Sequence, residues 1–225
     1  MTILVGVLCQ DGVVLGTDSA ATFGSSINNK TIEQPYNKIN VIGKNIIAVT
    51  TGEIGLGQRF VDIVRNQYDN KLFSDKPALE SARTIAQLSL QDFMSTNATK
   101  GSIGALLAFS NRGRPNLVEF SATNFQPEMK DEKLWYVSIA DPFLGLMRSS
   151  YCPDKPPPLP TGKFITAWTL DHTIRLNTGG IKGPMRIAVL KSNKGQYRAE
   201  ELSDGEINEH GNIIEDAYTH LKSFV

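Results

Sequence analysis

Two residue types with special chemistry are scarce in this chain of 225 residues, which has two cysteines and three histidines. Cys9 and Cys152 lie far apart in the sequence and form no CxxC pattern, so we expect reduced thiols rather than a disulfide framework. The histidines show no metal-ligand spacing with cysteine or carboxylate. We therefore predict neither a metal site nor a cofactor.

The chain also lacks an excess of charge and a long apolar run. It has 23 basic and 23 acidic side chains, so the electrostatic signature of a protein that binds DNA or RNA is missing. No apolar run approaches the roughly 20 residues needed to cross a bilayer. The opening segment lacks the basic region of a signal peptide. We expect a cytoplasmic protein without a nucleic-acid or membrane partner.

Strand patterns dominate the first quarter of the chain. Two apolar, β-branched stretches, Thr2–Cys9 and Val13–Asp18, flank the turn dipeptide Asp11-Gly12 and predict a hairpin. A second hairpin is predicted over 38–51, after a polar loop or weak edge strand at 28–34. From Ile54 onward the apolar residues recur with the spacing of one helix face. Further predicted elements are helices at 54–68, 75–93, 142–152, 165–176 and 206–224, and strands at 103–109, 117–120, 135–139, 185–190 and 197–202.

Strands in blocks followed by helices in pairs predict an α+β protein rather than alternating βαβ units. Asp75 is the expected N-cap of the second helix, with Pro77 in its first turn. The proline-rich stretch at 156–160 is expected to be a stiff spacer, too short to be a domain linker. Two antiparallel sheets between helix pairs satisfy this order. We expect residues 1–225 to form a single domain.

The common catalytic signatures are absent, and the candidate chemistry lies at the start of the chain. There is no GxSxG, HExxH, P-loop or SxxK pattern. Thr2 follows the initiator methionine, and removal of Met1 leaves an α-amine beside the threonine hydroxyl. Such an amine has a pKa of roughly 7.7–8.0, so it can act as the general base for its own hydroxyl. Thr2 is therefore a candidate nucleophile.

Several segments together resemble one known family. The stretches Thr2–Val7 and Asp11–Thr22, then Lys38 before a strand and the turn Thr50–Gly55, are similar to proteasome β-type subunits and the bacterial HslV peptidase. The resemblance is most specific over residues 2–57 and closest to the stand-alone bacterial proteasome-like proteins, such as the betaproteobacterial proteasome homologue. It implies the four-layer αββα sandwich of the N-terminal nucleophile hydrolases.

The resemblance implies a role for each matching residue. Thr2 is the nucleophile and, through its amine, the base. Lys38 donates to Thr2 and lowers the pKa values there by its positive charge. Asp18 pairs with Lys38 and keeps it charged. The Gly52 backbone N–H forms the oxyanion hole, a donor worth about 3 kcal/mol when well placed.

Two parts of the chain depart from the family pattern. The family has a serine in a GSGS segment where this chain has 137–143, so Ser138 is the candidate only with a register shift of one residue. Near the later Gly-Gly pair the family has an aspartate and then a serine, whereas this chain has Arg175 and Thr178. Thr178 can replace the serine hydroxyl. Arg175 reverses a charge and is expected to disturb the catalytic network.

The resemblance implies a threonine endopeptidase that degrades unfolded polypeptide or peptides inside a homo-oligomeric double ring. The resemblance leaves the ring size undecided between six and seven subunits, with seven favoured. The family also suggests an ATP-dependent unfoldase as partner. One alternative is an amidohydrolase acting on small amides, with a specificity pocket at Thr50, Ala21 and Ile54 beside Gly52. The other is a ring-forming scaffold with an impaired active site.

Overall fold

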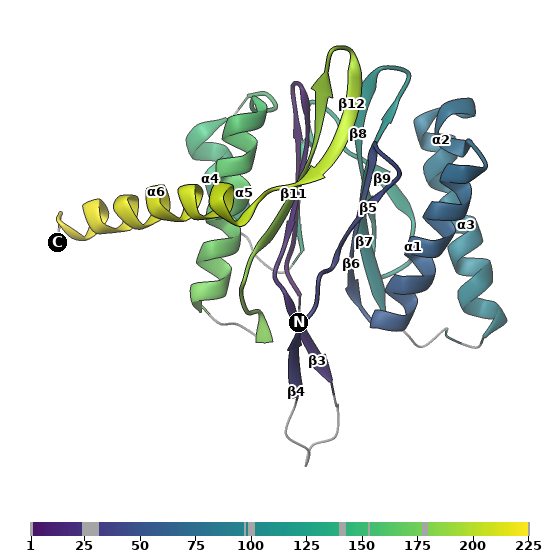
Figure 1. The fold of residues 1–225 in the computed structure, drawn as a ribbon, viewed down its shortest axis with the longest axis horizontal. Coiled ribbons are helices and arrows are strands. Elements are labelled where there is room, and N and C mark those ends of the chain that lie inside the picture. The colour runs from purple at the N-terminus through teal and green to yellow at the C-terminus, as the bar shows by residue number, and fades with distance from the viewer. Residues whose placement is uncertain are drawn as a thin grey trace.

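The computed structural model describes residues 2–23, 32–96, 98, 102–139, 143–152, 154–176 and 180–224. Two five-stranded antiparallel sheets stack on each other, and helices cover both outer faces (Figure 1). The predicted four-layer αββα sandwich is therefore confirmed. The two sheets bury apolar side chains against one another, including Leu4, Leu15, Val49 and Leu106, none of which is exposed to solvent.

The first sheet is built from the first two and the last three strands in the chain. Its strands, in spatial order, are β10 (Tyr136–Ile139), β1 (Leu4–Cys9), β2 (Gly12–Thr17), β11 (Arg186–Asn193) and β12 (Gln196–Glu201). The predicted first hairpin is formed by β1 and β2, with Cys9 opposite Gly12. Nearly every residue of these two strands is buried, because the second sheet covers one face and helices cover the other.

The second sheet is a meander. Its strands, in spatial and chain order, are β5 (Ile39–Ile42), β6 (Ile46–Gly52), β7 (Ile103–Asn111), β8 (Arg114–Phe120) and β9 (Pro127–Met129). A separate two-stranded hairpin, β3 (Ala20–Phe23) with β4 (Ile32–Pro35), leaves the sandwich beside the N-terminus (Figure 1). The sequence analysis did not anticipate β3 or β9, which are only four and three residues long.

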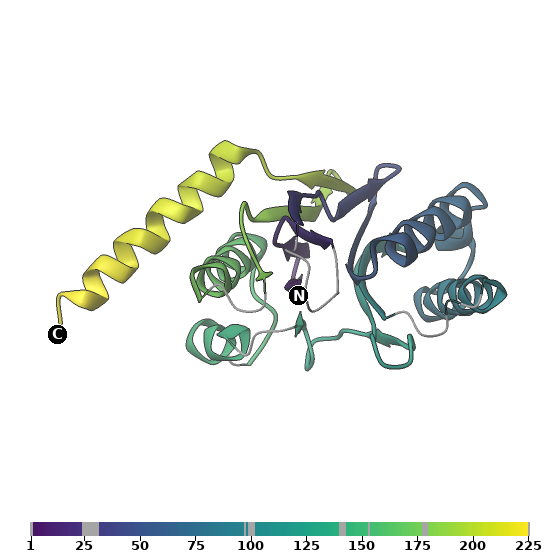
Figure 2. The same cartoon turned by 90° about the horizontal axis from the view of Figure 1, so that it is seen from below.

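Each outer layer is a group of helices. The second sheet is covered by α1 (Ile54–Asp69), α2 (Leu72–Asp75) and α3 (Ala78–Ser95), and the first sheet is covered by α4 (Phe143–Tyr151) and α5 (Leu159–Leu176). The last helix, α6 (Asp204–Lys222), packs its first half on α5 and then extends away from the body (Figure 2). No helix among the described residues is long and apolar enough to cross a bilayer.

Two predicted helix boundaries are wrong. Asp75 ends α2 instead of capping the next helix, because Lys76 takes the extended conformation favoured before a proline and Pro77 becomes the N-cap of α3. The helix predicted at 165–176 begins earlier, at Leu159, so the end of the expected spacer forms its first turn. Proline is tolerated there because the first turn leaves its backbone N–H groups unpaired in any case. Pro160 therefore does not exclude a helix.

Candidate active site

Thr2, Asp18 and Lys38 come together at one end of the sandwich. Thr2 lies two residues before the start of β1, Asp18 directly follows β2 in the same sheet, and Lys38 directly precedes β5 in the other sheet. The Lys38 Nζ donates to Thr2 Oγ1 over 2.9 Å and to Asp18 Oδ1 over 2.8 Å. One ammonium group thus joins the hydroxyl at the start of the chain to a carboxylate, across the gap between the two sheets.

Asp18 is held rigidly. It is fully buried, and besides Lys38 it accepts hydrogen bonds from the backbone N–H groups of Ile3 (3.2 Å) and Ala20 (3.1 Å). Thr17, its neighbour, donates its hydroxyl to the Ile3 carbonyl over 2.9 Å. These bonds fix the segment that carries Thr2 onto the end of β2. Thr17 is a positioning residue that the sequence analysis did not single out, although it stands beside Asp18.

Lys38 is a buried cation, with 5% of its surface exposed. Burial lowers the pKa of Lys38, because desolvation disfavours the charged form, and the hydrogen bond and charge of Asp18 partly oppose that shift. Asp18 is therefore the group that sustains positive charge beside the Thr2 hydroxyl. A positive charge at this distance favours the alkoxide form of the hydroxyl.

Gly52 ends β6 in a backbone conformation that requires glycine. Its φ is +97°, and a Cβ there would lie 2.0 Å from the Ser102 carbonyl oxygen. The next residue, Glu53, donates its N–H to that same carbonyl over 3.0 Å. Strand β5, which begins directly after Lys38, pairs with β6 on the side opposite β7. Lys38 lies on that side.

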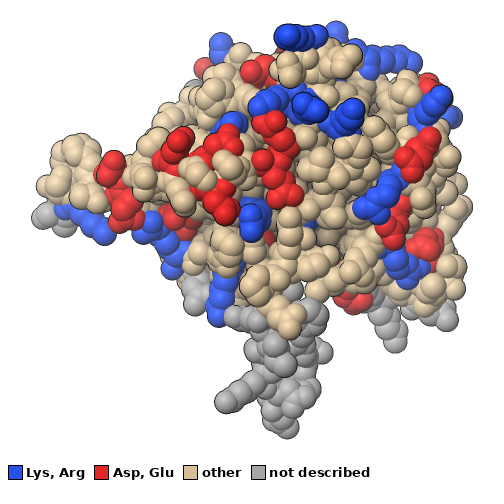
Figure 3. Space-filling model, in the orientation of Figure 1, with Lys and Arg blue, Asp and Glu red and all other residues tan. Residues whose placement is uncertain are grey.

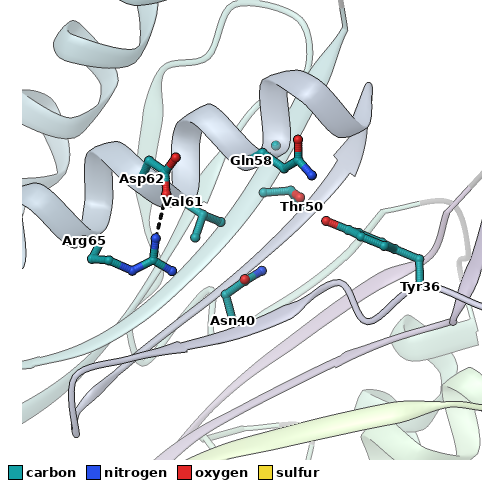
Figure 4. A pocket seen from close by; sticks show the side chains of 8 residues that line it. Tyr36, Asn40, Thr50, Gln58, Val61, Asp62 and Arg65 are labelled. Atoms are coloured by element: carbon teal, nitrogen blue, oxygen red, sulfur yellow. Dashed lines mark hydrogen bonds and ion pairs between the residues drawn. The ribbon is translucent and has the colours of Figure 1, made fainter.

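A polar pocket of about 380 Å³ lies next to this end of β6 (Figure 4). Its lining residues come from the segment before β5, from β5, β6 and α1: Tyr36, Asn40, Thr50, Gly57, Gln58, Val61, Asp62 and Arg65. Of the three residues expected to form a specificity pocket, Thr50 lines it, Ile54 is not among its lining residues, and the side chain of Ala21 lies outside the described part. Sequence reasoning missed Tyr36 and Asn40, which only the hairpin geometry brings to Thr50.

The structure does not bring Ser138 to the lysine. Ser138 stands opposite Val5 in the β1–β10 ladder, and Val5 packs toward the helices α4 and α5. Residues paired across an antiparallel ladder share a face, so Ser138 faces the helix layer, whereas its neighbours Val137 and Ile139 face the second sheet. The Ser138 hydroxyl is buried and has no hydrogen-bond partner among the described residues.

The part of the chain that contains Thr2, Asp18 and Lys38 also matches a known protein family. The sequence profile of the family described as "Proteasome subunit" matches residues 2–124, more than half of the chain. The chain belongs to this family. It is 38% identical over 72 residues to a proteasome subunit beta of Methanococcoides burtonii, a match covering 32% of this chain and 31% of that protein. It is 31% identical over 98 residues to one from Methanosarcina thermophila, covering 43% of each. The matches thus span less than half of these relatives.

Solved structures of Anbu proteins share the fold of this proteasome-family chain along its whole length. The Gly-1 mutant of Anbu from Hyphomicrobium sp. strain MC1 superposes with a TM-score of 0.76 at 14% identity, covering 100% of this chain and 98% of that one. Anbu from Yersinia bercovieri, called an ancestral beta-subunit, gives 0.76 at 12% identity over 99% and 95%. A helical assembly of the Anbu complex from Pseudomonas aeruginosa gives 0.74 at 13% identity, also over 99% and 95%.

Arg175 forms ion pairs on the outer helix layer of this proteasome-type fold, contrary to the expectation that it disturbs the catalytic network. Its guanidinium donates to Asp171 and Glu215, each over 2.6 Å, and lies over the ring of Tyr218. These carboxylates raise the pKa of Arg175 and balance its charge on the outer helix layer. Thr178 lies outside the described residues. No group of three or more potential metal-ligating side chains occurs in the described part of the chain.

Proposed function

We propose that this chain is a threonine-type peptidase of the proteasome family, with Thr2 as nucleophile. The observation that carries the proposal is the contact of the buried Lys38 ammonium with Thr2 Oγ1 at 2.9 Å, with Asp18 at 2.8 Å behind it. A salt bridge between Lys38 and Asp18 does not require a hydroxyl as a third partner. Nucleophile activation by an adjacent charge and base provides a reason for it.

The proposed reaction begins after Met1 has been removed, because only then is the Thr2 nitrogen an amine. That amine takes the hydroxyl proton as Oγ1 attacks the substrate carbonyl carbon, and the Gly52 N–H binds the oxyanion. Collapse of the intermediate breaks the peptide bond, and the amine returns the proton to the leaving nitrogen. Water then attacks the ester with the amine again as base, which frees the acid and restores Thr2.

The pocket beside Gly52 supports a peptide side chain as its occupant. Its polar groups are uncharged hydroxyls and amides, apart from the ion pair between Arg65 and Asp62 (2.6 Å). Figure 4 shows the Tyr36 hydroxyl directed toward Thr50 and Gln58.

A threonine nucleophile that cleaves unfolded chains with little sequence specificity is safe in the cytoplasm only when it is enclosed. We therefore propose a homo-oligomeric ring assembly that receives unfolded chains from an ATP-dependent unfoldase.

A small-amide hydrolase is the second candidate, because a pocket of about 380 Å³ also accommodates a small molecule. The experiment co-expresses the chain with a methionine aminopeptidase and compares release of acid-soluble fragments from fluorescently labelled, denatured casein with hydrolysis of a set of small amides. We expect casein fragmentation. Amide hydrolysis without casein fragmentation would replace the peptidase by the amidohydrolase. If mass spectrometry shows that Met1 has been removed and the protein hydrolyses neither casein nor amides, the remaining candidate is the ring-forming scaffold with an impaired active site.

A further inference from the structure

The polar pocket at the end of β6 contains hydrogen-bonding groups that the protein itself does not use. Figure 4 shows Tyr36, Asn40 and Thr50 lining it from the strand side and Gln58 lining it from α1. Within the described part of the chain, the hydroxyls of Tyr36 and Thr50 and the side-chain amide of Gln58 have no hydrogen-bond partner. A pocket with several convergent polar groups of this kind fixes the orientation of a ligand that can hydrogen-bond to them.

Two local features keep these groups available. A Cβ on Gly57 of α1 would lie 2.6 Å from Thr50 Oγ1, so the glycine leaves room for the hydroxyl where the helix crosses the strand. The amide nitrogen of Asn40 donates to the Lys38 carbonyl over 3.3 Å, which leaves the Asn40 Oδ1 as an acceptor. The pocket therefore offers hydroxyl donors together with an amide acceptor.

The acceptor lies farther from the candidate nucleophile than the hydroxyl of Thr50 does. Asn40 stands opposite Ala48 in the β5–β6 ladder. Ala48 precedes Thr50 by two residues, so the level of Asn40 is about 7 Å farther from the Gly52 end of β6. Val61 of α1 supplies an apolar wall to the same pocket. An occupant that reaches both polar levels therefore needs an aliphatic stem and a polar head.

The charges around the pocket do not favour an ionised occupant. Of its lining residues only Asp62 and Arg65 are charged, and they pair with each other over 2.6 Å with 67% and 51% of their side chains exposed. Figure 3 likewise shows acidic and basic side chains next to one another over the helices that cover the second sheet. An ionised side chain would lose hydration without a net attraction. A purely apolar one would cover the hydroxyls and amides and leave them unpaired.

We propose that this pocket selects glutamine as the residue on the acyl side of the cleaved bond. The attacked carbonyl is bound at Gly52 in the proposed reaction, so the side chain next to that carbonyl is the one that enters beside Thr50. The hydroxyls of Tyr36 and Thr50 donate to the oxygen of the glutamine amide. Its NH₂ group donates to Asn40 Oδ1, and its two methylenes pack on Val61. This inference rests on the proposed peptidase function and names its preferred substrates.

The first test compares fluorogenic peptides that differ only in the residue before the cleaved bond, which is glutamine, leucine, glutamate or arginine. With Met1 removed, we expect kcat/KM for glutamine to exceed each of the others at least tenfold, because a site built for hydrogen bonds rejects side chains that cannot form them. Tyr36→Phe and Thr50→Val should each lower the ratio of glutamine to leucine at least fivefold. A variant that only loosened the fold would lower both rates and keep their ratio.

Tyr151→Phe is the matched control for the loss of a tyrosine hydroxyl. Tyr151 is 48% exposed on α4, in the opposite helix layer from the pocket. This variant should keep the wild-type ratio of glutamine to leucine. A wild-type kcat/KM for leucine, glutamate or arginine that equals or exceeds the value for glutamine would overturn the inference and leave the peptidase standing.

A binding experiment separates this inference from the peptidase proposal. It measures fluorescence anisotropy of labelled hexapeptides with one central glutamine or leucine on Thr2→Ala, which keeps the pocket but lacks the nucleophile. We expect the glutamine peptide to bind at least fivefold more tightly, and equal binding would overturn the glutamine inference. Tighter glutamine binding, without any hydrolysis by wild type freed of Met1, would overturn the peptidase and leave the selectivity of the pocket standing. Absence of both binding and hydrolysis would overturn both proposals.

Discussion

Replacing Thr2 with alanine is expected to abolish peptide hydrolysis, by a factor on the order of 10⁴ or more, while the fold is retained. The methyl group of alanine cannot attack a carbonyl, and no other hydroxyl among the described residues accepts a hydrogen bond from Lys38. The structural loss is one partly buried hydrogen bond, about 1 kcal/mol, so the melting temperature should fall by about 2–4 °C. Casein digestion and calorimetry measure the two effects.

Two control variants make this prediction specific. Thr2→Ser keeps a hydroxyl at the same position and should retain measurable activity. Thr84→Ala removes a hydroxyl from the exposed face of α3, where it donates only to the Glu80 carbonyl, and should leave activity unchanged. Hydrolysis by Thr2→Ala at more than about a tenth of the wild-type rate would exclude Thr2 as the nucleophile.

Replacing Lys38 with methionine is expected to destabilise the fold and to abolish activity together. Asp18 is fully buried, and removing the ammonium leaves its carboxylate without a counter-charge, which typically costs about 3–5 kcal/mol. Lys76→Met is the matched control. Lys76 pairs with Glu80 on the surface of the α2–α3 region, with half of each side chain exposed, so its loss should cost less than about 1 kcal/mol. Urea unfolding measures both free energies.

A double-variant cycle separates stability from catalysis at this pair. The variant Lys38→Met with Asp18→Asn removes both charges, so it should be less destabilised than the sum of the single variants. It should nevertheless remain inactive, because nothing then polarises the Thr2 hydroxyl. A Lys38→Met protein that loses less than 1 kcal/mol would show that the buried pair does not hold this site together.

Local sequence signals predicted the hairpins and the layered fold. The Asp11-Gly12 turn lies between β1 and β2 as predicted, because such residues accept conformations that other residues resist. The start of α5 was missed, because a proline-rich stretch reads as a spacer. In the structure the end of this stretch forms the first turn of α5. Gly162 lets that turn pack closely on β1, since a Cβ there would lie 2.4 Å from Cys9 Sγ.

The candidate site was only partly predictable. Thr2, Asp18 and Lys38 lie at strand ends that the family resemblance aligns, and the structure brings all three together. Ser138 depended on a strand register, which pairing partners decide rather than local sequence, and the structure turns it toward the helices. The pocket residues Tyr36 and Asn40 carry no motif. They became visible only when β5, β6 and α1 were placed side by side.

The central claim is that Thr2, freed from Met1, is an activated nucleophile, and intact mass tests it most directly. The purified protein is weighed before and after incubation with a peptide epoxyketone, which needs both the hydroxyl and the free amine of an N-terminal threonine. The account predicts a chain lighter by one methionine that gains one full adduct, and no adduct on Thr2→Ala. A chain that has lost Met1 yet gains no adduct would contradict it.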